Sequence, residues 1–477
     1  MRALADFGAL CGVGATLAAE SGHPVLVSWT TEVPRCTVAE QVRRLSTGPA
    51  RTFVWTSAWT GHRRLAVGTA LDVTGCGADR FEQVSASWRR ARDGALVGGT
   101  GRRPSLVGGF SFVDGGADSW PAALMWLPAA ELTEVPGSPT ELTLNAWLRP
   151  SEQRDAAVRC AGEAVRGLLA ESAVVEAQQP KVVSTRETPS EFEWKLLVRR
   201  ALGEVAAGTF DGVVLARQLA VEFDRPVAVA GVLAGLIDQH RVGTVFGAQV
   251  GERWFVGRSP ECLLHLHDGR ADTHGLAGSV PRDPDPAVDA TLRHRLRTDP
   301  KLDREHMLVA DYVVGTLRRF FREVRTDTAT PVLELADIQH RQTGIQAVRA
   351  TQPADLLRLA GALHPTPAVG GFPTAPAMQW LAEHETVERG WYAAPIGWLG
   401  ADGQGELAVG IRSAELSGAS AVVYARCGIV DGSDPDEEYD ATCAKMRQML
   451  AVLGSFDDTA GTVNALTPQC ANMFRGP

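Results

Sequence analysis

Three features are missing from this 477-residue sequence, and each absence excludes a class of protein. Its eight cysteines form no C-x-x-C pair, which excludes a zinc ribbon and a thioredoxin-like dithiol and favours reduced thiols. There is no run of basic residues, and 47 Lys and Arg against 56 Asp and Glu argue against a nucleic-acid partner. No stretch reads as the roughly 20 apolar residues of a membrane span, and the N-terminus does not resemble a signal peptide. We therefore expect a cytoplasmic protein that binds neither nucleic acid nor a membrane.

The composition changes once, in a polar stretch without clear periodicity at residues 171–190. We interpret 1–175 as a strand-rich N-terminal half that serves as scaffold, 190–456 as a C-terminal half that carries the chemistry, and 457–477 as a tail. The polar stretch is either a linker between the halves or a loop inside one large domain. In the N-terminal half, apolar runs predict strands at 24–29, 106–112 and 123–127, and composition predicts a helix at 154–170.

Local signals in the C-terminal half predict helices and strands in irregular alternation. Ser190 and Glu193 fit a capping box that starts a helix ending at Gly208. Asp299 is the expected cap of a long helix over 301–323. Further elements are predicted as a strand at 213–216, a hairpin at 243–249 and 254–256, and a helix at 435–453. This irregular order argues for an α+β fold rather than a doubly wound α/β sheet.

Several polar residues stand in contexts that suit chemistry, although each also has an ordinary structural explanation. Glu261 follows a proline that fixes its direction, but it could equally be a solvated acid in a turn. The small residues of 273–279 could present backbone N–H groups to an anion, or could simply form a flexible loop. We expect Arg412 to lie in an apolar strand. A buried guanidinium there needs an anion, either a ligand carboxylate or a structural Glu.

Two predicted helices carry further candidate acids. Glu305 lies in a charged segment at 303–306 that could be no more than a solvated face. Glu438 precedes Lys445 by seven residues, so both share one face of the helix predicted at 435–453, with Glu438 near its positive end. A carboxylate there could hold a metal or a substrate cation, or could only complement the helix dipole, which is the commoner case.

Taken together and in order, these segments resemble the chorismate-utilising enzymes, the family of isochorismate synthase, salicylate synthase and the anthranilate synthase large subunit. The His-Pro-Thr-Pro-Ala segment that ends at Ala368 is most similar to isochorismate synthases of menaquinone or siderophore pathways. The resemblance is carried by nine segments: Val213-Val214-Leu215-Ala216-Arg217, Ser259-Pro260-Glu261, Leu276-Ala277-Gly278-Ser279, Glu305-His306, His340-x-x-Thr343, His364-Pro365-Thr366-Pro367-Ala368, Arg389-Gly390-x-Tyr392, Ile411-Arg412-Ser413-Ala414 and Gly428-Ile429-Val430.

The resemblance implies an α+β fold, a single large domain of two stacked, mostly antiparallel sheets with helices outside. It implies an isomerase that adds water at C2 of chorismate and expels the C4 hydroxyl, with Glu261 as the acid and His340 close to the ring. Glu305 and Glu438 match glutamates that hold Mg²⁺ at the ring carboxylate. The candidate substrate-binding positions are Thr273, Ala277, Gly278, Ala368, Tyr392, Arg412, Arg426, Gly428 and Lys445.

The sequence departs from the family pattern at three positions that bear on the chemistry. Gly212 stands where the family has a basic lysine, so nothing at that position activates water. Arg426 replaces a glycine beside the substrate carboxylate, and Ala441 replaces a glutamate that binds Mg²⁺ directly. We hypothesise that the last two changes compensate, with Arg426 supplying the positive charge that makes the dependence on Mg²⁺ weak or absent.

Two functions therefore stay open. The first is an isochorismate synthase-like enzyme with a divergent active site, which forms isochorismate or a related elimination product. The second is a chorismate-binding protein of a secondary-metabolite pathway that is catalytically silent or forms an altered product. Both require a small-molecule substrate, chorismate or a close relative, and partner proteins stay unknown from the sequence.

Overall fold

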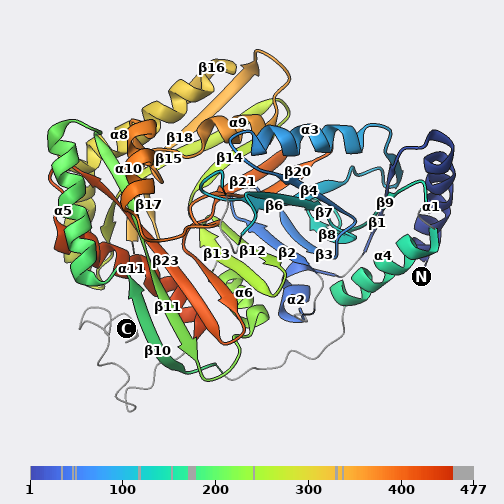
Figure 1. Ribbon diagram of the computed structural model, residues 1–477, viewed down its shortest axis with the longest axis horizontal. Helices are drawn as coiled ribbons and strands as arrows, with labels where there is room; N and C mark the ends of the chain where they lie inside the picture. The colour runs from blue at the N-terminus through green and yellow to red at the C-terminus, as the bar shows by residue number, and fades with distance from the viewer. Residues whose placement is uncertain are drawn as a thin grey trace.

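The computed structural model describes residues 2–33, 36–45, 48, 51–115, 120–151, 154–169, 179–239, 242–327, 331–335 and 338–454. Helices surround two large sheets, which is the α+β architecture that the resemblance implies (Figure 1). The helices are α1 (Arg2–Ser21), α2 (Val38–Arg43), α3 (Arg80–Arg92), α4 (Arg154–Leu168), α5 (Glu191–Ala207), α6 (Val229–Asp238), α7 (Pro286–Thr298), α8 (Pro300–Leu317), α9 (Leu356–Leu363), α10 (Thr374–His384) and α11 (Pro435–Leu453).

Both sheets are built almost entirely of antiparallel pairs, with β1 and β5 as a parallel pair at one edge. The first sheet has the order β10 (Val182–Thr188), β11 (Gly212–Phe223), β23 (Ser420–Val430), β22 (Ser413–Ser417), β13 (Arg253–Ser259), β12 (Thr244–Val250), β2 (Thr52–Ser57), β3 (Arg63–Val67), β8 (Ala130–Glu134), β9 (Glu141–Leu148), β1 (Val25–Glu32) and β5 (Leu96–Gly99), and β19 (Gly371–Phe372) pairs with β11. The second has the order β16 (Phe321–Thr326), β18 (Ile338–Ala350), β15 (Arg270–Pro281), β14 (Cys262–His267), β21 (Gly405–Val409), β20 (Pro395–Gly400), β6 (Ser105–Phe110), β7 (Ala123–Leu127) and β4 (Leu71–Gly75), and β17 (Val332–Glu334) pairs with β18.

The two sheets pack face to face through a shared apolar core. Phe53 of β2 in the first sheet meets Trp126 of β7 in the second edge to face, with ring centroids 6.0 Å apart. A second apolar core lies on the other side of the first sheet, where Leu215 of β11 and Met446 of α11 belong to one buried cluster. Side chains of β11 therefore alternate between a helix-covered face and a face that looks toward the second sheet.

The N-terminal and C-terminal halves of the chain share both sheets. β2 pairs with β12 in the first sheet, and β6 pairs with β20 in the second. Of the two interpretations of the polar stretch at 171–190, this continuity favours a connection inside one large domain. Residues 171–178 and the tail at 457–477 lie outside the described residues.

Most of the local sequence signals give the predicted elements. The capping box of Ser190 and Glu193 is formed at the start of α5, and Gly208 ends this helix in the left-handed conformation. Asp434 caps α11, with Pro435 in its first turn. The predicted strands at 24–29, 106–112 and 123–127, the hairpin near 243–256 and the helix at 154–170 correspond to β1, β6, β7, β12 with β13, and α4.

Three local predictions are wrong. The helix predicted at 301–323 ends at Leu317, and the chain then turns into β16, because Phe321 enters the sheet by pairing with Ala350. Residues 276–279 do not form a loop; they belong to β15, and its pairing with β18 shifts register at Gly278, whose φ is +73°. Arg412 precedes β22 with φ of +51° rather than lying in a strand.

Helix α1 also departs from expectation. By length and hydropathy it is the one described helix that could cross a membrane, contrary to the expectation that no stretch comes close. Its small and apolar residues serve packing, because Phe7, Cys11 and Ala18 are buried and the helix lies on β1, β9 and α4. This packing accounts for the apolar residues on one face of α1, whereas Val13 and Leu17 are exposed.

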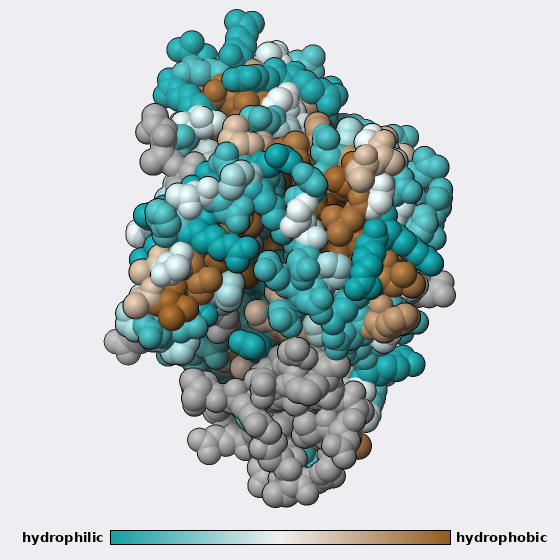
Figure 2. All heavy atoms as spheres, turned by 90° about the vertical axis from the view of Figure 1, so that its left-hand side faces the viewer, coloured by the Kyte–Doolittle hydropathy of each residue, from teal (hydrophilic) through white to brown (hydrophobic). Residues whose placement is uncertain are grey.

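The end of the molecule that carries α5 and α8 is mostly hydrophilic, with apolar residues in separate patches (Figure 2). Phe192 and Leu196 of α5 and Met307 of α8 are among its exposed apolar side chains. Hydrophilic residues lie between the apolar patches of this view, so no single apolar face dominates this end.

Candidate active site

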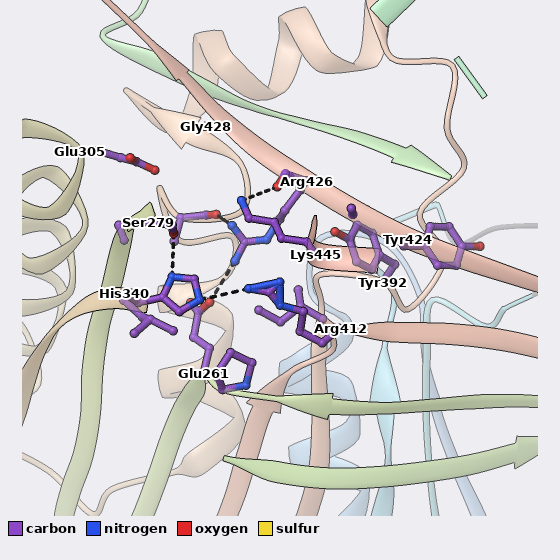
Figure 3. Close-up of a pocket in the computed structure, with 16 residues that line it drawn as sticks. Glu261, Ser279, Glu305, His340, Tyr392, Arg412, Tyr424, Arg426, Gly428 and Lys445 are labelled. Carbon is purple, nitrogen blue, oxygen red and sulfur yellow. Dashed lines mark hydrogen bonds and ion pairs between the residues drawn. The ribbon is translucent and has the colours of Figure 1, made fainter. Parts of the chain in front are cut away.

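A small cavity of about 50 Å³ lies where the two sheets meet α8 and α11 (Figure 3). β23 supplies its residues from the first sheet, β15 and β18 from the second, and Glu261 stands where the chain passes from β13 to β14. The cavity is lined by Pro260, Glu261, Leu276, Ala277, Ser279, Glu305, His340, Ala368, Tyr392, Ile411, Arg412, Tyr424, Ala425, Arg426, Gly428 and Lys445.

Arg426 and Glu261 form a buried ion pair in this cavity. Arg426 Nη2 lies 3.0 Å from Glu261 Oε2, and the two side chains are 16% and 4% exposed. Arg426 Nη1 also donates to the carbonyl oxygen of Ala368. Burial raises the pKa of Glu261 above its ordinary value, although Arg426 and Arg412 act against this rise. Arg426 Nε is buried and has no hydrogen-bond partner within the described part of the chain.

The pairing of β11 with β23 determines which side chains face the cavity. Ala216 pairs with Arg426, Val214 with Gly428, and Gly212 with Val430. The alternate residues Leu215 and Cys427 belong to the helix-covered core, so these three pairs look toward the second sheet. Position 212 thus lies on the same face as Arg426. A Cβ atom at 212 would nevertheless lie only 2.9 Å from Val430 Cγ1.

His340 is held in a chain of hydrogen bonds at the cavity wall. Arg412 Nη2 lies 3.1 Å from His340 Nε2, and His340 Nδ1 lies 2.6 Å from Ser279 Oγ. Since a guanidinium only donates, Nε2 must accept, so the ring carries its proton on Nδ1 and donates it to Ser279. Burial and then Arg412 hold the pKa of His340 well below its ordinary value. A neutral imidazole with a fixed tautomer therefore faces the cavity.

Two tyrosines form a stacked wall. The rings of Tyr392 and Tyr424 lie 4.8 Å apart and nearly parallel, and both line the cavity. Burial raises the pKa of Tyr392 to about 12, so its hydroxyl stays protonated at neutral pH and can donate a hydrogen bond.

Glu305 enters the cavity from α8 beside the backbone of β23. A Cβ atom on Gly428 would lie 2.9 Å from Glu305 Oε1, so the glycine leaves room for this carboxylate. Lys445 of α11 donates to the carbonyl oxygen of Arg426 at 2.9 Å. Burial, and then the neighbouring Glu438, raise the pKa of Glu305, while Lys445 and Lys301 oppose the rise.

An adjoining cavity shares Glu305, Gly428 and Lys445 with the first, and it contains the candidate magnesium ligands. In this cavity Lys301 Nζ lies 2.8 Å from Glu438 Oε1. The side chain of Ala441, which also lines this cavity, has no oxygen. Among the described residues, Glu305 and Glu438 belong to no group of three or more side chains with ligand atoms close enough to hold a metal. Mg²⁺ in proteins commonly binds one or two carboxylates and completes its octahedron with water and substrate, so Glu305 and Glu438 would hold it only with such added ligands and against the charge of Lys301.

Most of the predicted site residues meet in the main cavity. Thr273 is an exception, because its hydroxyl donates to the carbonyl oxygen of Leu263 and it lines a separate cavity on β14 and β15. Gly278 forms the bulge between two lining residues but does not line the cavity itself, and Glu438 lies in the adjoining cavity. The residues brought together are Glu261, Ala277, Glu305, His340, Ala368, Tyr392, Arg412, Arg426, Gly428 and Lys445.

Sequence reasoning missed two residues of this region. Tyr424 lies two positions before Arg426 on β23, so strand alternation already placed both on one face. Lys301 lies four positions before Glu305 on α8, so helical spacing placed both on one side. Neither residue belongs to the segments that carried the resemblance.

Comparisons with known proteins show the family of this chain. A family model described as chorismate binding enzyme matches residues 13–454. This chain belongs to the chorismate-binding enzyme family. It is 34% identical to a salicylate biosynthesis isochorismate synthase of Pseudomonas aeruginosa over 82% of this chain and 84% of that protein. It is 32% identical to the isochorismate synthase MenF of Bacillus subtilis over 79% of this chain and 82% of that protein.

The fold agrees as well. The solved structure of MenF, the menaquinone-specific isochorismate synthase from Escherichia coli, matches 92% of this chain and 100% of its own with a TM-score of 0.77 and 25% identity. The identity of the family is settled by these matches, whereas Gly212, Arg426 and Ala441 bear on what this member does.

Proposed function

We propose that the chain binds chorismate in the main cavity and acts on it as an isochorismate synthase-like enzyme with a divergent active site. The observation that carries this proposal is the meeting of an acid, Glu261, with the donors Arg412, Tyr392 and Lys445 in one buried cavity. Chorismate carries two carboxylates and a C4 hydroxyl. Its carboxylates need cationic and hydroxyl donors, and its C4 hydroxyl needs an acid to protonate it as it leaves.

In this proposal Glu261 protonates the departing C4 hydroxyl. Burial raises the pKa of Glu261 and so favours its acid form, and a ligand that displaces Arg426 removes the largest charge that opposes this rise. Arg412 and Tyr392 bind the enolpyruvyl carboxylate, with a hydrogen bond from Arg412 to His340 fixing the guanidinium. No basic side chain stands at Gly212, so addition of water at C2 is expected to be slower by about 10²–10⁴-fold. An acid without that base favours elimination of water or pyruvate over hydration.

The ligand set supports a weak dependence on Mg²⁺. Lys301 already neutralises Glu438, and Ala441 offers no ligand. The idea that Arg426 takes over from the metal needs revision, because its guanidinium contacts Glu261 and Ala368 and does not line the cavity around Glu438 and Ala441. We propose instead that Lys301 supplies the positive charge beside Glu438.

A second function is favoured by the ion pair itself. Arg426 fills part of the cavity and holds Glu261 as a carboxylate, which cannot donate a proton until a ligand displaces the guanidinium. A protein that keeps this pair when chorismate binds would be a chorismate-binding protein that is catalytically silent or forms an altered product. The partly unpaired guanidinium could then bind a ligand carboxylate through Nε.

A proton NMR time course of the purified protein with chorismate, with and without Mg²⁺, separates these functions. Isochorismate, or an elimination product, that forms at similar rates with and without the metal supports the first. Binding in calorimetry without any change in the NMR spectrum supports the second. Glu261→Gln should abolish turnover and keep chorismate binding, and unchanged turnover in that variant rejects the role of Glu261. Absence of both binding and turnover rejects the proposal.

A further inference from the structure

A hairpin outside the main cavity brings two histidines and an aspartate together. β14 and β15 are joined by Asp268 and Gly269, which have φ of +48° and +72° as in a type I′ turn. This two-residue turn fixes the register, so that His267 pairs with Arg270 and His265 pairs with Asp272. Because side chains of a strand alternate, the two histidines share one face, and Asp272 lies directly across from the first of them.

The three side chains are near enough to share one ion. Their ligand atoms all lie within 4.8 Å of one another, and His267 Nε2 is 2.7 Å from Asp272 Oδ2. The imidazole rings of His265 and His267 are stacked with centroids 4.4 Å apart. Ligands at about 2.0–2.1 Å from a tetrahedral Zn²⁺ stand roughly 3.4 Å apart, which small side-chain rotations would achieve here.

The group faces an open cavity rather than the core. The alternate residues Leu264 and Leu266 are buried in the apolar core, whereas the side chains of His267 and Asp272 are 30% and 27% exposed. A third histidine, His62, lines the same cavity and has a buried Nδ1 without a hydrogen-bond partner among the described residues. An ion could therefore enter from solvent.

The surroundings of Asp272 orient it as they would a metal ligand. Arg270 Nη2 lies 2.8 Å from Oδ1, Arg270 Nε lies 2.9 Å from each carboxylate oxygen, and Gln346 Nε2 lies 3.3 Å from Oδ1. Carboxylates that bind metals in proteins are commonly held by such hydrogen bonds. These contacts concentrate on Oδ1 and leave Oδ2 directed at His267, so a metal would replace the proton that these two groups share.

We propose that His265, His267 and Asp272 form a binding site for a divalent transition-metal ion, with Zn²⁺ as its most suitable occupant. Two imidazoles and one carboxylate are a common protein ligand set for Zn²⁺, with the remaining position open to water. The ion would hold β14 and β15 together at the end of the hairpin. β14 begins directly after Glu261, and β15 continues to Ala277 in the main cavity. The site thus stabilises the segment that carries the proposed acid.

Isothermal titration calorimetry of the full chain, freed of metal with EDTA, with Zn²⁺ alone tests the site. We expect one equivalent to bind, and His267→Gln and Asp272→Asn each to weaken binding at least ten-fold. Asp268→Asn is the matched control, because it removes an 86% exposed carboxylate next to His267 and suits the turn, and binding should be unchanged. His265→Ala provides a third variant should either of the others fail to fold by circular dichroism.

Co²⁺ gives an independent readout of the ligands. Its visible spectrum should show nitrogen and oxygen ligation without a thiolate charge-transfer band, since the exposed thiols of Cys76 and Cys160 are the obvious competing ligands. A thiolate band, or Zn²⁺ binding that survives both His267→Gln and Asp272→Asn, overturns the proposal, as does absence of binding. The experiment contains no chorismate, so its outcome is independent of the function proposed for the main cavity.

Discussion

Replacing Arg426 by alanine should destabilise the protein in a way that depends on pH. The substitution removes the guanidinium and leaves the Glu261 carboxylate, which is 4% exposed, without its ion-pair partner. Breaking a buried ion pair at one side costs about 3–5 kcal/mol. The entropy of unfolding grows with chain length. For 477 residues, a loss of this size lowers Tm by about 3–5 °C at neutral pH.

The sign of the pH dependence follows from Glu261. Burial already raises its pKa, and removing Arg426 takes away the largest opposing charge, so the pKa rises further. The folded variant then keeps a proton that the unfolded chain has lost above its ordinary pKa of about 4.5. Stability therefore falls as the pH rises through the window between these two pKa values. The difference in Tm between the unaltered chain and the variant should be small at pH 5 and largest near pH 8.

Differential scanning calorimetry at pH 5, 6, 7 and 8 measures this effect, and the double variant Arg426→Ala with Glu261→Gln provides the control. A neutral amide needs no cation, so the double variant should recover most of the lost Tm and show no added dependence on pH. An Arg426→Ala variant that loses the same Tm at every pH would refute the reasoning. A double variant whose Tm is no higher than that of Arg426→Ala would also refute the reasoning.

Three other substitutions test the geometry of the site. Gly428→Ala brings a Cβ to 2.9 Å from Glu305 Oε1, so chorismate affinity measured by calorimetry should fall about ten-fold, equivalent to roughly 1.4 kcal/mol. Ala441→Glu adds an oxygen ligand to the adjoining cavity, and calorimetry should show at least ten-fold tighter Mg²⁺ binding. In Gly212→Lys the new Cβ lies 2.9 Å from Val430 Cγ1. This variant should therefore have a Tm lower by about 1–3 °C and should not form isochorismate faster in the NMR assay.

Each of these substitutions has a control or a contrary outcome. Gly203→Ala in α5 adds a Cβ where no atom lies within 4 Å, so it should leave chorismate affinity unchanged. Ala441→Gln tests whether the charge matters, because an amide oxygen is the weaker ligand for Mg²⁺. Isochorismate formation that rises in Gly212→Lys would show that Val430 yields easily and that only the base was missing.

Local sequence signals determined many of the elements. The capping box at Ser190, the cap at Asp434 and the turn at Gly208 act over a few residues, so their structural result does not depend on distant parts of the chain. The ordered motifs from 213 to 430 likewise indicated the family and the architecture of two sheets, which the fold and the comparisons confirm. The metal preference and the roles of individual site residues stay predictions.

Tertiary structure alone decided which residues share the cavity and what each contacts. Glu261 and Arg426 are 165 positions apart, and their ion pair arises because β22 pairs with both β23, which carries Arg426, and β13, which ends just before Glu261. Thr273 belongs to the same strand as Ala277, yet its hydroxyl bonds to backbone and lines another cavity. The physical reason is that strand pairing brings distant segments together at particular places along a strand. Four residues of β15, about 13 Å, separate Thr273 from Ala277, so the two side chains meet different partners.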